Sequence, residues 1–275
     1  MNDSQSIEQK IKRWLDKNGY PLEMRVARKL AELDFGVTQS HYYEDFESGK
    51  PREIDVVSRL YDFQEPKNYV AIAELETFST IECKSAKNPW VVFCETEPNI
   101  WDIEQALSNK AGKKLLMRSQ KQLQKTVFYR WSCKAGHGVA QALGGNEDLA
   151  YTAVMSAIKA AEAKVRVSLE EESEWEKNNK YTDISLSIIV IPAVVISAPL
   201  FECRLVSQGD VEIREVQHSS LVFRYPRKTS GYKAGIVVHI ISESALNEFL
   251  EGLSEFHNAA KSELESMIPS PSNDA

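Results

Sequence analysis

The hydrophobic residues at the start of the chain recur at intervals of three and four, which is the period of an α-helix. We expect a first amphipathic helix over about residues 4–17. A second helix should begin at Pro21 and end at Gly36, because proline favours the first turn of a helix and glycine its end. The apolar stripe of the first helix is Ile7, Ile11, Trp14 and Leu15. The buried stripe of the second is Leu22, Val26, Ala27, Leu30 and Leu33.

After residue 36 the pattern changes to extended segments rich in β-branched residues, separated by loops with glycine, proline and asparagine. Strands are expected at 37–45, 53–63, 69–84, 90–93, 184–197, 200–206, 211–216, 220–225 and 234–242. Helices are expected at 100–129, at 147–177 after a cap at Asn146, and near the C-terminus. This order predicts an α/β fold with a central mixed sheet flanked by helices, a helical insertion and additional C-terminal strands.

The composition changes this picture little. The chain has 275 residues, 43% hydrophobic and 27% charged, as in an ordinary globular protein. The nearly uncharged stretch Ile184–Phe201 contains two prolines and many β-branched residues, so we expect buried core strands and no membrane contact. The expected organisation is an N-terminal helix over 1–19, a single domain over 20–266 and a disordered tail over 267–275.

The four cysteines are widely scattered, which favours reduced thiols and a cytoplasmic location. The first residues lack a basic start and an apolar run, so no secretory signal is expected. Cys133 and His137 are four residues apart, but no second ligand pair follows them, so a zinc site is not expected.

Candidate chemistry begins with Glu82 and Lys84, in the sequence Ile-Glu-Cys-Lys. Residues two apart on a strand point to the same face, so the carboxylate and the ammonium should be neighbours. A second carboxylate, Asp55, lies in the preceding expected strand, in the sequence Arg-Glu-Ile-Asp. Two carboxylates and a lysine between apolar flanks suit a divalent metal and an activated water.

These segments resemble the motifs of the PD-(D/E)xK nuclease superfamily. The order is a helix with an early acid (Glu23), a hairpin that ends in Glu-Ile-Asp-Val-Val, and then Ile-Glu-Cys-Lys. The likeness is greatest to the Mrr-type restriction endonuclease and Holliday-junction-resolvase-like branch. It covers about residues 20–93 and, more loosely, 189–201. The resemblance implies a restriction-endonuclease-like core over 20–95, followed by a basic helical region over 100–180 and later strands over 184–266.

The resemblance also implies a role for each residue. Asp55 and Glu82 take the metal-binding places, Lys84 is the lysine of the final motif, and Glu23 is the assisting helix acid. Mg²⁺ or Mn²⁺ would be bound by the two carboxylates and the backbone carbonyl of Cys83. Lys84 would orient a water molecule or stabilise the charge that develops on the phosphate.

Simpler readings of the same residues remain open. Glu82 and Lys84 could form a solvent-exposed ion pair on an edge strand, which contributes little stability. Asp55 could end a hairpin, and Glu23 could be an acid favoured by the positive end of a helix. The spacing from Asp55 to Glu82 is longer than is usual in the family, so the strands between them should be extended or bulged.

The charge distribution is uneven. The whole chain carries a net charge of −7, but no Asp or Glu occurs between residues 105 and 146. The predicted nucleic-acid-binding residues in this stretch are Lys110, Lys113, Lys114, Arg118, Lys121, Lys125 and Arg130. Four of them recur at intervals of three or four and should line one helix face, where they could follow a phosphate backbone. A solvated helix face or a patch for an acidic partner would give the same pattern.

The sequence therefore predicts a Mg²⁺-dependent nuclease that cleaves DNA, with a role in restriction, phage defence or repair. The first alternative is a catalytically silent, nuclease-like subunit that binds DNA within a larger complex. The second is a protein-interaction module. A homodimer or a partner subunit is left open.

Overall fold

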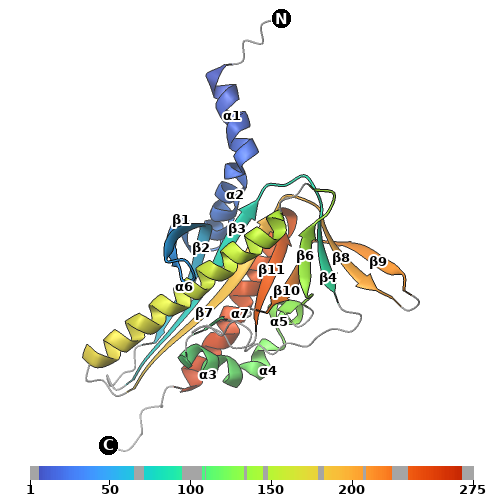
Figure 1. The fold of residues 1–275 in the computed structure, drawn as a ribbon. Helices are drawn as coiled ribbons and strands as arrows, with labels where there is room; N and C mark the ends of the chain where they lie inside the picture. Colours follow the sequence, from blue (N-terminus) through green and yellow to red (C-terminus); the bar gives the residue numbers. More distant parts are fainter. Residues whose placement is uncertain are drawn as a thin grey trace, which may run out of the picture.

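The computed structural model describes residues 6–64, 71–94, 107–108, 110–132, 135–144, 148–178, 183–206, 209–224 and 235–267, and Figure 1 shows how its elements are arranged. The first elements are α1 (Ile7–Asn18), α2 (Tyr20–Glu32), β1 (Gly36–Asp45), β2 (Lys50–Gln64), β3 (Ala71–Lys84) and β4 (Trp90–Cys94). The middle elements are β5 (Leu107–Ser108), α3 (Lys110–Arg118), α4 (Gln120–Leu123), α5 (Val127–Ser132), β6 (Gly138–Gln141) and α6 (Leu149–Asn178). The last elements are β7 (Asp183–Ile196), β8 (Leu200–Leu205), β9 (Val211–Val216), β10 (His218–Phe223), β11 (Ile236–Ser242), the 3-10 helix η2 (Glu243–Ala245) and α7 (Leu246–Met267).

The larger sheet is mixed. Its strands lie in the order β1-β2-β3-β7-β11-β10, and β5 pairs with β7 outside this order. β1, β2 and β3 form an antiparallel meander, whereas β3 pairs with β7, and β7 with β11, in parallel. A parallel neighbour requires a crossover connection, and the segment that ends in α6 supplies it. The carboxyl ends of β3, β7 and β11 therefore meet at one edge of the sheet.

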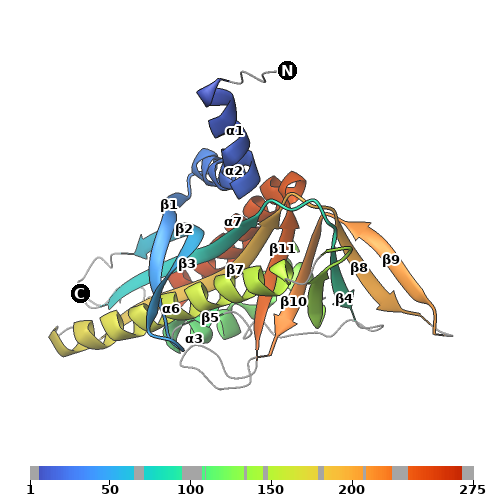
Figure 2. The same cartoon turned by 45° about the horizontal axis from the view of Figure 1, so that its top comes forward.

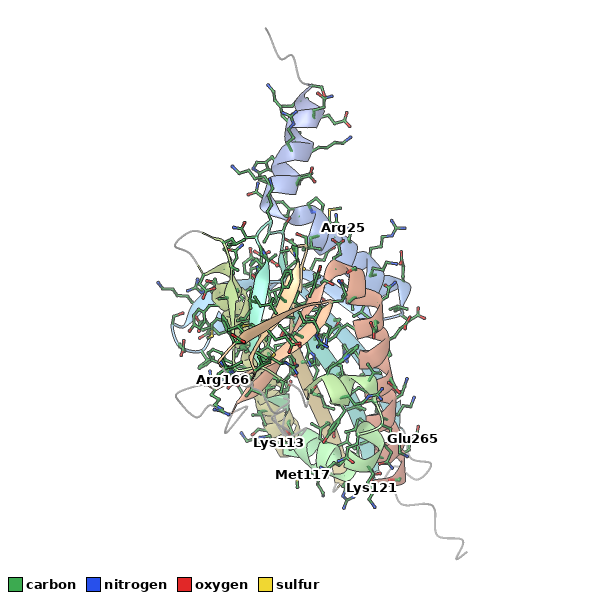
Figure 3. The ribbon with its side chains drawn as sticks, turned by 90° about the vertical axis from the view of Figure 1, so that its right-hand side faces the viewer. Arg25, Lys113, Met117, Lys121, Arg166 and Glu265 are labelled. Atoms are coloured by element: carbon green, nitrogen blue, oxygen red, sulfur yellow. The ribbon has the colours of Figure 1, made fainter. Side chains whose placement is uncertain are left out.

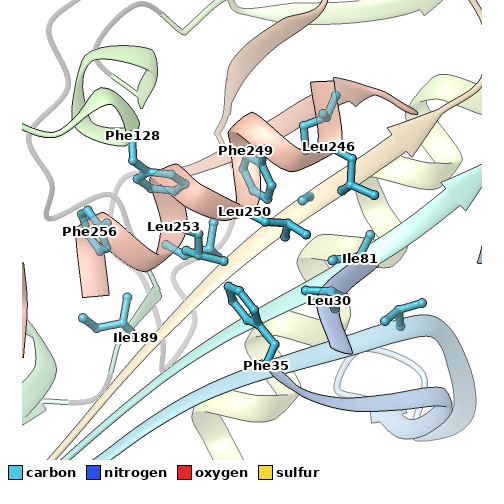
Figure 4. Packing of buried hydrophobic residues seen from close by; sticks show 14 of the residues in the cluster. Leu30, Phe35, Ile81, Phe128, Ile189, Leu246, Phe249, Leu250, Leu253 and Phe256 are labelled. Atoms are coloured by element: carbon cyan, nitrogen blue, oxygen red, sulfur yellow. The ribbon is translucent and has the colours of Figure 1, made fainter. Parts of the chain in front are cut away.

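Helices cover both faces of this sheet and bury two clusters of apolar side chains. On one face, α2 and α7 pack against the strands through residues such as Leu30, Ile81 and Phe249 (Figure 4). On the other face, α6 packs through residues such as Ala157 against Val194 and its neighbours. Burial on both faces explains why β7 is apolar along most of its length.

A smaller sheet with the strand order β6-β4-β8-β9 lies beside the larger one. Trp90 of β4 is fully buried and joins the apolar cluster under α6. Figures 1 and 2 show the β8–β9 hairpin at the edge of the molecule.

The expected α/β architecture, with a mixed sheet between helices, is confirmed. The apolar stretch 184–201 forms β7 and the start of β8, as expected for core strands. Among the described residues, no helix is long and apolar enough to cross a bilayer. The expected tail lies outside the described residues from position 268 onward.

Of three local predictions, two were wrong and one concerns a residue outside the described part of the chain. α2 ends at Glu32, not at Gly36, because the chain turns at Asp34, whose φ is 61°, and Gly36 instead begins β1. The expected cap at Asn146 lies outside the described residues. Among those described, Asp148 accepts a hydrogen bond from the backbone N–H of Tyr151 at the start of α6.

The single helix expected over 100–129 is also wrong. The described part of this region forms β5 and three short helices, with turns at Ser119 and after Leu123. Thr126 starts α5, since its hydroxyl accepts a hydrogen bond from the N–H of Tyr129 at 3.2 Å. Short helices let this region bend so that Leu115 and Leu123 are buried in the core cluster that includes α7.

Candidate functional site

Two neighbouring strands bring Asp55 and Glu82 together. β2 and β3 pair without interruption from Gln64↔Ala73 to Val56↔Ile81, and Asp55 and Glu82 are the next residues of each strand. The Oδ2 atom of Asp55 accepts a hydrogen bond of 2.7 Å from the backbone N–H of Cys83. In the described residues, the long gap in sequence is therefore spanned by two extended antiparallel strands in continuous register, with no bulge.

Lys84 and Glu82 form an ion pair, as two residues on one strand face should. The Lys84 Nζ atom lies 2.5 Å from Oε1 of Glu82, and the two side chains are 28% and 8% exposed. This pair is largely buried between β2 and β7, so the reading as an exposed surface pair is wrong. The other carboxylate oxygen of Glu82, Oε2, is buried and has no hydrogen-bond partner among the described residues.

The third acid, Glu23, reaches the same place from α2. Gly19 adopts a φ of +85° between α1 and α2, a conformation that side chains rarely allow, and a Cβ there would lie 3.6 Å from the Cβ of Ser85. The start of α2 is thereby held against the end of β3. Glu23 is half-buried in the first turn of α2, where its charge acts on Asp55 and Glu82.

Burial and mutual repulsion perturb these acids in one direction. Burial, together with the charges of Asp55 and Glu23, raises the pKa of Glu82 to about 7 against the opposing effect of Lys84. Burial likewise raises the pKa values of Asp55 and Glu23. Each ionised carboxylate raises the free energy of ionising the other two, so a bound cation would stabilise all three acids in this buried place.

Lys84 stays protonated in this arrangement. Burial acts to lower the pKa of its ammonium, but the charge of Glu82 and the hydrogen bond to it outweigh burial, so the net shift is upward. A lysine that acts as a general base needs a lowered pKa. The geometry therefore favours Lys84 as a fixed positive charge and hydrogen-bond donor.

Two further residues at the site were missed in the sequence. Ser40 of β1 has a φ of 50°, and the ladder between β1 and β2 omits its pair with Asp55. A non-glycine residue in this conformation is strained, and such strain often accompanies functional sites. Tyr43 is the second: burial raises its pKa to about 12, with further contributions from Asp45 and Glu82. Neither residue carries a motif that would have identified it.

A cavity of about 480 Å³ adjoins these residues between β1, β2 and α6. Tyr43 and Thr80 line it, and Thr80 precedes Glu82 by two positions on the same strand. Lys164 and Arg166 of α6 also contribute to its wall. The volume is in the range of small-molecule sites. Asp55, Glu82 and Lys84 do not line this cavity themselves; Tyr43 and Thr80 lie between it and the acids along β1 and β3.

No group of three His, Cys, Asp or Glu side chains in the described part of the chain forms a ready metal site. The donor set nevertheless suits a hard cation, because it offers two carboxylates, one with an unpaired buried oxygen. Cys83 contributes its N–H to Asp55. Its role as a carbonyl ligand stays a prediction.

The basic residues lie far from this cluster. α2 contacts η2, which immediately precedes α7, through the ion pair between Arg25 and Glu243. In Figure 3, Lys113 and Lys121 lie at the opposite end of the molecule, near Glu265 at the end of α7. α7 has 22 residues, which corresponds to a length of about 33 Å.

The side chains of this basic group point largely to solvent. Lys114, Arg118, Lys121, Lys125 and Arg130 are exposed, and Lys113 is partly so. The side chain of Lys110 lies outside the described part. Among the described residues, the basic region and the acids therefore do not share a cleft.

Comparison with known proteins adds no family. The sequence matches no family model, and neither the curated proteins nor the solved structures include a significant match. The functional argument consequently rests on the residues and their geometry.

Proposed function

We propose that this chain is a metal-dependent nuclease that hydrolyses phosphodiester bonds in DNA, in restriction, phage defence or repair in the cytoplasm. The proposed core is restriction-endonuclease-like and consists of α2, β1, β2, β3, α6 and β7. The order of these elements supports it: a helix, an antiparallel meander, a crossover helix and a parallel strand. The motif resemblance of Asp55, Glu82 and Lys84 falls on this same part of the chain.

The observation that carries the proposal is the convergence of Asp55, Glu82 and Lys84 at the adjoining ends of β2 and β3. Three charged groups in a largely buried place weaken the fold unless each has a partner. Their presence beside a carboxylate oxygen with no hydrogen-bond partner among the described residues supports a functional role.

Asp55 and Glu82 would hold Mg²⁺ or Mn²⁺, with the carbonyl of Cys83 as a further ligand. When bound, the ion would neutralise charge on the scissile phosphate and lower the pKa of a coordinated water. Asp55 is already oriented by the N–H of Cys83. Glu23 would accept a hydrogen bond from a metal-bound water and so help to orient it.

Lys84 would act on the substrate as a donor. If Glu82 bound a cation, its carboxylate would no longer contact Lys84. The ammonium of Lys84 would then be free to bind a phosphate oxygen. There it would stabilise the negative charge that grows as the phosphorus–oxygen bond breaks.

The test is a cleavage assay of the full chain on linear, circular, methylated and branched DNA, with Mg²⁺, with Mn²⁺ and with EDTA. Asp55→Asn and Lys84→Gln should each lower the rate by about 100-fold or more. Lys87→Gln, an exposed lysine just beyond the motif, is the matched control and should cleave like the wild type. Unchanged cleavage by either site variant would show that the assignment is wrong.

A second candidate is a nuclease-like subunit that binds DNA without cutting it. The distance between the acids and the exposed basic residues favours it, because DNA bound along the basic residues need not reach the acids. This hypothesis predicts that the protein binds DNA but yields no cleavage product with any divalent metal ion. Reversing Lys114 and Arg118 to glutamate would then weaken binding and flatten its salt dependence.

A further inference from the structure

Helix α1 presents an apolar stripe that the rest of the described chain does not cover. Ile7, Ile11 and Trp14 are 74, 51 and 55% exposed, and the helix has no buried residue. Figure 1 shows α1 projecting from the body of the molecule beyond α2. An amphipathic helix gains stability mainly by packing its apolar face against another surface. We therefore expect this stripe to bind a partner.

The small sheet has a second apolar surface that no described part of the chain covers. One of its faces turns inward: Glu202 of β8 accepts a hydrogen bond from Ser219 of the larger sheet and pairs with Arg204 and Arg214. The alternate residues form what we call the outer face. They are Val91, Phe93, Phe201, Cys203, Leu205, Val211 and Ile213.

The outer face is continuous across three strands, since Phe93 pairs with Cys203 and Cys203 with Ile213. Leu205, Val211 and Ile213 are 57, 57 and 63% exposed. Contiguous apolar surface of this kind usually marks an interaction site.

The charges around the two surfaces are complementary. Lys10, Arg13 and Lys17 follow one flank of the α1 stripe at intervals of three and four. Glu215 lies on the outer face opposite Phe201, and Asp210 lies in the turn before β9. A helix with a basic flank thus fits a sheet with an acidic margin.

We propose that α1 of one copy packs on the outer face of a second copy, and that the exchange is reciprocal. The exposed apolar side chains of α1 and the outer face together amount to roughly 700–800 Å², the size of a weak contact. Two such contacts in a two-fold dimer bury about 1,500 Å², the size of a stable interface. The reciprocal exchange of α1 also limits the assembly to a dimer, because both apolar surfaces are then covered in both copies.

The test is analytical ultracentrifugation of the full chain up to about 100 µM, a range that covers micromolar dissociation constants. The wild type should be a dimer. Ile11→Glu on α1 and Ile213→Glu on β9 should each weaken the dimer by at least about 30-fold, because a carboxylate would be buried without a partner. Met117→Glu, at an equally exposed apolar residue of α3, should change nothing.

Mixing the two interface variants gives the decisive result. A heterodimer of Ile11→Glu with Ile213→Glu keeps one intact contact, between the unchanged α1 of one copy and the unchanged outer face of the other. The mixture should therefore dimerise more tightly than either variant alone. Circular dichroism on both variants verifies that these surface changes leave the fold intact.

Three outcomes would overturn the proposal. The first is a monomeric wild type at every concentration, and the second is a wild-type-like dimer of Ile213→Glu. The third is a mixture no tighter than its components. Binding of the monomer to anionic vesicles, lost in Ile11→Glu, would instead assign α1 to a lipid surface.

Discussion

Replacing Glu82 by glutamine should abolish a loss of stability that the wild type undergoes as the pH rises, while it removes a proposed metal ligand and the partner of Lys84. The side chain is buried, one of its oxygens is unpaired among the described residues, and two other acids act on it. Glutamine keeps the shape and the hydrogen-bonding capacity without the charge. The variant therefore separates the cost of the buried charge from the cost of a changed side chain.

The magnitude follows from linkage. Burial, with Asp55 and Glu23, raises the pKa of Glu82 from 4.5 to about 7, so the folded state holds the proton more tightly than the unfolded state does. The resulting stabilisation is complete below pH 4.5 and is lost as the pH rises to about 7. At 1.36 kcal/mol for each pKa unit, the full loss is about 3 kcal/mol.

The assay is urea unfolding at pH 5 and at pH 8, followed by circular dichroism and analysed by linear extrapolation. Between these two values the free energy of unfolding of Glu82→Gln, relative to the wild type, should rise by about 2–3 kcal/mol. Glu251→Gln, at an exposed position of α7, is the control and should follow the wild type at both values.

An equal pH dependence in Glu82→Gln and the wild type would refute the reasoning, because it would mean that the carboxylate is well solvated. A second readout concerns the metal. Mg²⁺ should raise the melting temperature of the wild type at pH 8 and have little effect on the variant, since a ligand stabilises the state that binds it.

Three further predictions concern stability. The buried His239 lies 3.0 Å from the half-buried His218, and burial lowers the pKa of both. The free energy of unfolding should therefore fall as the pH drops below about 6.5, and His218→Asn should reduce that slope in urea titrations. Asp62→Asn removes the carboxylate that contacts His257 at 2.7 Å and should cost about 1–3 kcal/mol at pH 7; an unchanged denaturation midpoint would contradict this. Leu253→Ala opens a cavity at a fully buried position of α7 and should cost about 2–5 kcal/mol, measured by chemical unfolding.

Much of the first hundred residues could be predicted from local patterns. The stripe of α2 is confirmed at Leu22, Val26, Ala27 and Leu30, because helical spacing directly reports which face is buried. The meander of β1, β2 and β3 could also be predicted, since loops with glycine and proline separate its strands. Adjacent strands in sequence usually pair, so Asp55 and Glu82 were expected to be neighbours.

Predictions beyond this part depended on contacts that are distant in sequence. The sequence did not indicate where the basic residues lie relative to the acids, and the structure places them at the other end of α7. Their helix was expected to be continuous, but the chain turns at Ser119 and Thr126 to bury Leu115 and Leu123. The hydroxyl cap at Thr126 is a signal in the sequence that could have indicated this break.

The sequence by itself determined which residues can form helices and strands and which charged groups share a strand face, because these properties depend on neighbours two to four positions away. Only the tertiary structure decided that Glu82 is buried with an unpaired oxygen, that Ser40 breaks the ladder beside Asp55, and that the α1 stripe remains exposed. Burial and charge coupling arise from segments far apart in the chain. Their strength is set by the packing of α2, β2, β3 and β7 around one another, which no local pattern encodes.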